Sequence, residues 1–328
     1  MTNVLVVGGA GYIGGTLTDQ LIAAGYNARV YDNLLFEERY LKPVDFICGD
    51  VRDQAALLPH MKWADTVVWL VGLVGDGACG LYPELTEELN VESVKWLVAN
   101  FNRRIIFMST CSVYGAQDGL LTEESPFNPL SLYARTKVVG EQILGDRAIY
   151  FRLGTLFGLG DQFSRIRLDL VLNLLTVKAC LYGRMSVFGG EQWRPLLHVR
   201  DVAGAVVANI GTPHVGPFNL RTENLTMSIL AERIATLVPG SVVERTEIKF
   251  QDARNYKVSA DKARDTFGFA PKLTVEDGIT ETRDLVQQGR IQDASSPRYS
   301  NTDFLRPIFL PQQGPLGGEI IPLRWKTK

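Results

Sequence analysis

The stretch Gly8-Gly9-Ala10-Gly11-Tyr12-Ile13-Gly14 follows a short apolar run at residues 4–7 and opens a helical pattern. Its first glycine permits a tight turn, Gly11 lets the backbone approach a pyrophosphate, and Gly14 allows close packing of a helix on a strand. Asp32 stands 18 residues beyond Gly14, at the end of the next apolar run. A carboxylate there accepts hydrogen bonds from ribose hydroxyls and repels a 2′-phosphate. The pattern predicts NAD binding; a structural glycine turn with a solvated aspartate is the alternative.

Further apolar runs alternate with helical patterns along the first half of the chain. The runs lie at residues 28–31, 45–48, 66–70, 104–108 and 148–152, and helical patterns include 14–25, 86–102 and 132–144. This alternation predicts an α/β fold with crossover connections and a parallel sheet, and the change of pattern after about residue 158 places a smaller lobe in the later segments. We assign residues 1–160 and about 190–225 to the first domain, and about 161–189 and 226–288 to the second. Residues 289–328, rich in Pro, Gly and Ser, are expected to form an extended tail.

The bulk composition excludes several function classes. The 328 residues carry a net charge of −2, with no basic run that would indicate nucleic acid or a membrane surface as partner. No apolar run approaches the ~18 residues of a membrane span, and the N-terminus lacks a signal-peptide pattern, so a cytoplasmic location is expected. The four cysteines form no C-x-x-C motif and the three histidines are scattered, so no metal site is predicted.

Tyr133 and Lys137 are four residues apart in a helical pattern and therefore share one helix face. Free tyrosine has a pKa near ~10 and is a poor base at neutral pH. A lysine ammonium and a cationic nicotinamide both favour the phenolate, which can then remove a proton from a substrate hydroxyl. Such spacing arises easily by chance; here it follows a dinucleotide site and the stretch Ser109–Gly115 at a strand end.

Together these motifs resemble the extended short-chain dehydrogenase/reductases, in particular the NAD-dependent nucleotide-sugar epimerase/dehydratase family. Further landmarks are Asp32-Asn33-Leu34, Gly49-Asp50-Val51 and the segment from Arg194 to Ala203. The resemblance implies a Rossmann doubly wound parallel sheet with a smaller α/β substrate-binding C-terminal domain. It also implies a catalytic trio of Thr110, Tyr133 and Lys137, in which Thr110 hydrogen-bonds the reacting sugar oxygen. It implies NAD contacts from Gly8, Gly11, Tyr12, Ile13, Gly14, Asp32, Asn33, Leu34, Asp50, Val51, Leu70, Val71, Gly72, Tyr133 and Lys137. Asp50 is placed to meet the adenine amino group, and a plain turn aspartate is the alternative.

On the substrate side, the resemblance implies a nucleotide-diphosphate sugar as partner. Arg194 and Arg254 are expected to reach its diphosphate, as guanidinium groups pair with phosphate oxygens; surface salt bridges are the alternative reading. Asn173 matches an asparagine that contacts the phosphates, and Val187 lies in the stretch that lines the base pocket. Thr155 stands where many relatives have asparagine. A homodimer through the helices at 86–102 and 132–144 is also implied.

The reaction is narrowed by a departure from the family pattern. Where 4,6-dehydratases have Thr-Asp-Glu, this chain has Thr110-Cys111-Ser112, so the acids that eliminate water are missing. We therefore expect a 4-epimerase that works through a transient 4-keto sugar with Tyr133 as base. A 4-dehydrogenase or keto-reductase with net redox change is one alternative, and a non-catalytic NAD(H)-binding regulatory protein is another. The base and the sugar stay open.

Overall fold

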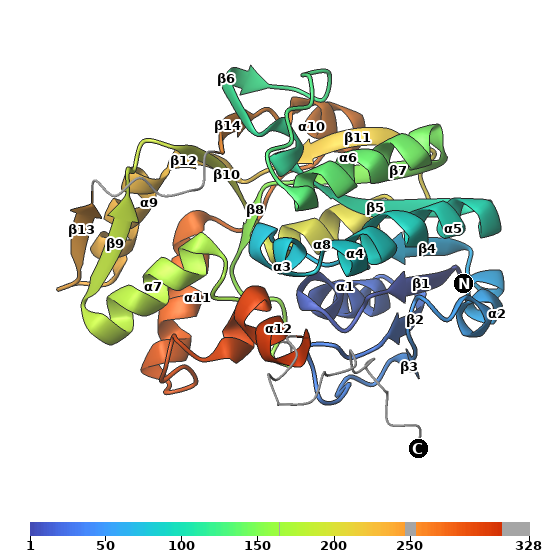
Figure 1. The fold of residues 1–328 in the computed structure, drawn as a ribbon, viewed down its shortest axis with the longest axis horizontal. Coiled ribbons are helices and arrows are strands. Elements are labelled where there is room, and N and C mark those ends of the chain that lie inside the picture. The colour runs from blue at the N-terminus through green and yellow to red at the C-terminus, as the bar shows by residue number, and fades with distance from the viewer. Residues whose placement is uncertain (164, 247–253, 310–328) are drawn as a thin grey trace, which may run out of the picture.

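A seven-stranded sheet forms the centre of the larger of two lobes (Figure 1). The computed structural model describes residues 1–163, 165–246 and 254–309. All neighbouring strands of this sheet are parallel. In spatial order they are β11 (Gly216–Leu220), β7 (Ala148–Leu153), β5 (Arg104–Thr110), β4 (Thr66–Trp69), β1 (Asn3–Val7), β2 (Asn27–Asp32) and β3 (Asp45–Cys48). The predicted doubly wound sheet is confirmed.

Both faces of the central strands β1, β4, β5 and β7 are buried, which is why these strands are largely apolar, whereas the edge strand β3 is partly exposed. In β1, Val4 and Val6 pack against Leu17 of α1 (Tyr12–Ala23) and, with α8 (Val199–Ala208), form one core. The intervening Leu5 and Val7 point to the opposite face. That face is covered by α2 (Gln54–Trp63), α5 (Ser93–Asn100) and α6 (Leu132–Leu144).

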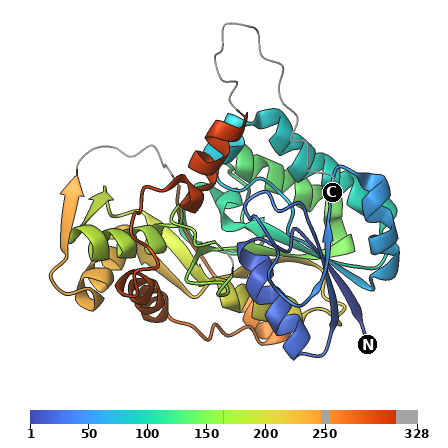
Figure 2. The ribbon, with the colours of Figure 1, turned by 90° about the horizontal axis from the view of Figure 1, so that it is seen from below.

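The smaller lobe has its own core and is built mainly from later segments (Figures 1 and 2). It contains α7 (Val171–Tyr182), β9 (Arg184–Phe188), α9 (Met227–Leu237), β13 (Val242–Thr246) and α11 (Val275–Gln287). A three-stranded sheet of β12 (Glu223–Thr226), β10 (Trp193–His198) and β8 (Thr155–Phe157) and the pair β6 (Ala116–Leu121) with β14 (Asn255–Val258) complete the strands of the described segments. Further short helices include α3 (Asp76–Leu81), α4 (Pro83–Glu87) and α10 (Asp261–Phe267).

Three predicted elements differ from the structure. The first helix begins at Tyr12 rather than Gly14, because Gly11 is its N-cap. The helix predicted over 86–102 is α4, a π-helical segment Glu88–Glu92 and α5; the π segment places Asn90 for bonds described below. The expectation of an extended tail is wrong for residues 301–309, which form α12 (Asn301–Phe309) because Leu305 is buried against α3. Residues 310–328 of that predicted tail lie outside the described part, and the use of 86–102 and 132–144 as a dimer face stays a prediction.

Candidate active site

The glycine-rich turn lies between β1 and α1, as the motif requires. Gly8 has φ +82°, and a Cβ on it would press against the backbone of Leu70 and Val71. A Cβ on Gly14 would overlap the backbone of Gly9, so only glycine allows α1 to start this close to the turn. Because Gly11 has no side chain to cap the helix, the first N–H groups of α1 are suited to bind an anion. The turn therefore fits a dinucleotide pyrophosphate.

Asp32, the last residue of β2, organises the backbone around the expected ribose position. Its Oδ2 accepts from the Ala10 N–H at 3.0 Å and its Oδ1 from the Leu34 N–H at 2.7 Å. Burial raises the pKa of Asp32, and these backbone N–H groups counteract the rise. Leu34 has φ +54°, a conformation that non-glycine residues rarely adopt and that often occurs at ligand sites. Asn33 Oδ1 accepts from the Leu35 N–H at 3.1 Å, which continues the turn.

Asp50 is not free at the end of β3. Arg52 binds it with two side-chain bonds of 2.9 and 2.8 Å, and Asn33 Nδ2 donates to it at 3.3 Å. Burial alone would raise the pKa of Asp50, but the Arg52 bonds bring it below its ordinary value. The adenine contact expected of Asp50 would therefore be shared with this ion pair. The neighbouring Val51 is buried in the core.

The segment after β4 lies between the glycine-rich turn and α6. Leu70 donates its N–H to the Val7 carbonyl at 2.8 Å, which seats residues 70–72 beside the glycine turn. Asn90 accepts from the Leu73 N–H at 2.8 Å and donates to the Leu73 carbonyl at 3.0 Å. It also donates to Thr136 Oγ1 on α6 at 3.1 Å. Asn90 was not recognised from the sequence because its partners lie on two other segments.

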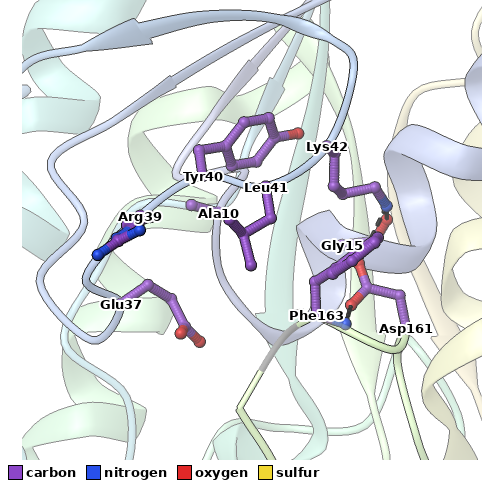
Figure 3. Close-up of a pocket in the computed structure, with 9 residues that line it drawn as sticks. All are labelled: Ala10, Gly15, Glu37, Arg39, Tyr40, Leu41, Lys42, Asp161 and Phe163. Carbon is purple, nitrogen blue, oxygen red and sulfur yellow. Dashed lines mark hydrogen bonds and ion pairs between the residues drawn. The ribbon is translucent and has the colours of Figure 1, made fainter.

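A small pocket on the other side of the glycine turn is structural (Figure 3). Its cavity is about 20 Å³, enough for a water molecule and too small for an organic ligand. Lys42 lies along one side of it, with its ammonium bonded to the Gly15 carbonyl and to Asp161 Oδ2 at 3.0 Å. This buried ion pair ties the segment after β2 to α1 and to the segment after β8.

The predicted catalytic side chains come together at the carboxyl end of β5. Thr110 ends this strand, and its Oγ1 accepts from the Ser112 N–H at 3.1 Å. Tyr133 and Lys137 lie on α6, with the Lys137 ammonium 6.0 Å from the centre of the tyrosine ring. Lys137 Nζ donates to the Met108 carbonyl at 2.9 Å, which fixes α6 against β5. In parallel α/β sheets, ligands bind outside the carboxyl ends of the strands, so this position suits a site of chemistry.

The groups around Tyr133 have opposite effects on its pKa. Burial raises the pKa of Tyr133, and the neighbouring Cys79 and Asp76 raise it further. Arg167 and a hydrogen bond from Thr110 act in the opposite direction, because both favour the phenolate. Neither Cys79 nor Arg167 was recognised from the sequence. Cys79 lies on α3 and Arg167 in the segment before α7, and only the fold brings them to Tyr133.

The substrate-side arginines also converge. Arg194 on β10 donates to the Arg254 carbonyl. Arg254 Nη1 lies 3.3 Å from Ser112 Oγ and 3.5 Å from Asp76 Oδ2. Arg254 therefore reaches the segment after Thr110, and Arg194 is joined to the backbone carbonyl of Arg254. The other carboxylate oxygen of Asp76, Oδ1, is buried and has no hydrogen-bond partner among the described residues.

Three other expected substrate residues are placed differently. Asn173 is fully buried; its carboxamide accepts from the Gly158 N–H at 3.0 Å and donates to the Arg167 carbonyl at 3.0 Å, so it shapes the loop that bears Arg167. The Val187 side chain lies in the core of the smaller lobe, which leaves its backbone to line a base pocket. Thr155 begins β8 and is partly exposed.

Comparison with known proteins identifies the family. A model of the NAD dependent epimerase/dehydratase family matches residues 4–220. The chain belongs to this family. A UDP-glucose 4-epimerase of Rhizobium meliloti is 35% identical over 320 residues, covering 85% of this chain and 95% of that protein. UDP-glucuronic acid decarboxylase 1 of Arabidopsis thaliana is 25% identical and covers 84% of this chain and 68% of its own length.

Solved structures agree with the epimerase/dehydratase fold. The UDP-glucuronic acid 4-epimerase of Bacillus cereus, solved with UDP-glucuronic acid and NAD, superposes with a TM-score of 0.77 at 21% identity. The alignment covers 88% of this chain and 99% of that one. The predicted family, fold, cofactor NAD and enzyme class, an extended short-chain dehydrogenase, are confirmed. In the described ranges, no helix is both long and apolar enough to cross a membrane. The same ranges contain no cluster of His, Cys, Asp or Glu suited to a metal ion.

In this epimerase/dehydratase-family enzyme, we expect the free energy of unfolding to depend on pH because Lys137 is buried. Burial lowers its pKa to about 8, with Cys79 and Glu141 opposing the fall. In the unfolded chain, the lysine has a pKa near ~10.4. Below pH ~8 the lysine is charged in both states, so folding bears the cost of burying the charge. As the pH rises to ~10, the folded protein loses this proton first and the cost disappears. In NAD-free protein, the free energy of unfolding should gain on the order of 3 kcal/mol from Lys137 across this window.

The measurement is denaturant unfolding at several pH values, with Lys137→Met as the reference. This variant carries the same other titrating groups, so the difference between the two curves isolates Lys137. We expect that difference to change in favour of the wild type between pH 8 and 10. A difference that is constant with pH would show that Lys137 keeps an ordinary pKa.

Proposed function

We propose that this enzyme is a nucleotide-sugar 4-epimerase in which Tyr133 is the catalytic base. The observation that carries the proposal is the combination of an intact Thr110–Tyr133–Lys137 set with no acid beside Thr110. Cys111, the next residue, is fully buried and directs its thiol to the Arg152 carbonyl at 3.1 Å. Burial raises the pKa of this thiol, so it is no proton donor to a departing water. The 35% identity to a UDP-glucose 4-epimerase supports the same reaction.

The proposed mechanism follows from the roles of the three side chains. Thr110 hydrogen-bonds the oxygen on C4, and Tyr133 removes the proton of that hydroxyl. The Lys137 and Arg167 charges favour the phenolate form in which Tyr133 can act. NAD, when bound, accepts the C4 hydride and later returns it. After the 4-keto sugar has turned over, Tyr133 gives the proton back to the oxygen on C4, and the configuration is inverted.

The substrate is held, in this proposal, from both lobes. Arg194 and Arg254 pair with the diphosphate, because guanidinium groups bind phosphate oxygens through two N–H groups. The buried Asp76 Oδ1 is a hydrogen-bond acceptor that needs a donor, and a sugar hydroxyl supplies one. A nucleotide sugar therefore offers a diphosphate to the two arginines and a hydroxyl to Asp76 Oδ1.

The test is to incubate purified enzyme separately with UDP-glucose and UDP-glucuronic acid. Products are identified by proton NMR, and NADH is followed by absorbance. We expect a C4-inverted sugar and no net NADH. Net NADH in proportion to product would instead establish a dehydrogenase, and loss of water or carbon dioxide would establish a dehydratase or decarboxylase. Absence of conversion of either sugar would also count against the proposal.

A further inference from the structure

Asn301, the first residue of α12, joins three segments of the chain through its polar atoms. It is 4% exposed. Its backbone N–H donates to Asp169 Oδ2 at 3.1 Å, and its Nδ2 donates to the Val74 carbonyl at 3.0 Å. Its Oδ1 accepts from Arg165. Both polar atoms of this buried carboxamide are hydrogen-bonded. If its partners moved apart, a buried polar atom would be left unpaired, so the bonds hold the partners in one arrangement.

The rest of α12 packs on α3 (Figures 1 and 2). Leu305 has no exposed surface and lies in one apolar cluster with Cys79 of α3. The Tyr82 hydroxyl donates to the Leu305 carbonyl at 3.1 Å. Thr302 lies so close to Gly77 that a Cβ on this glycine would overlap its side chain. The helix therefore connects α3 of the larger lobe with residues 165–169 before the smaller lobe.

Both connected segments contribute charges to the surroundings of Tyr133. The ionisable groups that shift its pKa are Cys79 and Asp76 of α3 and Arg167 of the 165–169 segment. The Lys137 ammonium of its own helix lies 6.0 Å from the centre of its ring. Arg167 is oriented by Asp169 through two bonds of 3.0 Å. Asp169 in turn accepts the Asn301 N–H. A chain of contacts thus leads from the start of α12 to the cation beside Tyr133.

We propose that Asn301 is a positioning residue that holds Arg167 and α3 against Tyr133. The proposal rests on the role of Tyr133 as the base. If the two side-chain anchors of Asn301 are lost, its N–H no longer stays in place for Asp169, and Arg167 is less well held. Tyr133 then loses part of the charge that favours its phenolate, and its pKa rises. Activity should fall most at the acid side of the pH range, where the phenolate is scarcest.

The test compares Asn301→Ala with Asp303→Ala, an exposed residue two positions further along the same helix. Both are assayed as NAD-containing full-length enzyme over pH 5.5–9.5 with the sugar that the wild type converts. In Asn301→Ala, we expect the acid limb of the kcat profile to move to higher pH by about half a unit to one unit. KM should change little, and Asp303→Ala should match the wild type. A loss of folded enzyme that is the same at every pH would lower the whole profile without moving the limb.

A double-mutant cycle with Arg167→Met tests the route of the effect. If Asn301 acts through Arg167, Asn301→Ala should not move the limb further in the Arg167→Met background. An equal shift in both backgrounds, or an activity loss that is the same at every pH, would overturn the positioning role. A wild-type enzyme that shows no C4 inversion would instead refute the proposed function, which separates the two failures.

Discussion

Replacing Tyr133 by phenylalanine should lower kcat by about 10²- to 10⁴-fold, the usual contribution of a general base. The ring packs beside the apolar cluster of Leu73 and Cys79, and phenylalanine keeps that packing. Only the hydroxyl that exchanges the proton and bonds Thr110 is removed. The fold and the cofactor site should therefore survive, and the loss should appear in the chemical step.

The measurement is the rate of C4 inversion together with the NAD content of the purified protein and its thermal midpoint. Tyr26→Phe is the matched control, because this tyrosine lies just after α1, away from the cleft. We expect the control to keep wild-type activity. Retention of activity within a few-fold in Tyr133→Phe would assign the base to another group, while loss of NAD would mean that the cofactor site had been damaged.

The second large effect is expected from Glu141→Gln, which leaves a buried charge without its partner. Glu141 lies one turn beyond Lys137 on α6, and Arg152 on β7 binds it at 3.0 and 2.6 Å. Both side chains are 3% exposed. Ser109 also donates its hydroxyl to Glu141. Removing one partner of such a pair costs about 3–5 kcal/mol, because the remaining charge stays desolvated.

Denaturant unfolding measures this loss, and Glu92→Gln is the control. Glu92 pairs with Lys95 at 2.6 Å, but both side chains are 55% exposed, so the change should stay below about 1 kcal/mol. The double variant Glu141→Gln/Arg152→Met should recover part of the lost stability, since no unpaired charge remains. Equal losses in the free energy of unfolding for Glu141→Gln and Glu92→Gln would show that the buried pair contributes no more to stability than the exposed one.

The fold of the larger lobe was predictable because its signals are local. Each buried strand is a short apolar run, and α6 begins and ends at the residues that the periodicity indicates. The same reasoning failed for α12. The Pro- and Ser-rich composition around it carries no clear period, and the helix is stabilised by contacts of Asn301 and Leu305 with distant segments. A local sequence pattern predicts a helix poorly where tertiary packing supplies most of the helix's stability.

The sequence by itself determined the glycine-rich turn at Gly8–Gly14, the carboxylate at Asp32 and the tyrosine–lysine spacing, because each depends on residues close together in the chain. Only the tertiary structure placed Asp76, Arg167 and Asn301 around that chemistry. Asn301 and Val74, for instance, are 227 residues apart and joined by one hydrogen bond. Spacing along a helix or a turn follows from backbone geometry, whereas the charge that a buried phenol experiences depends on which distant loops pack beside it.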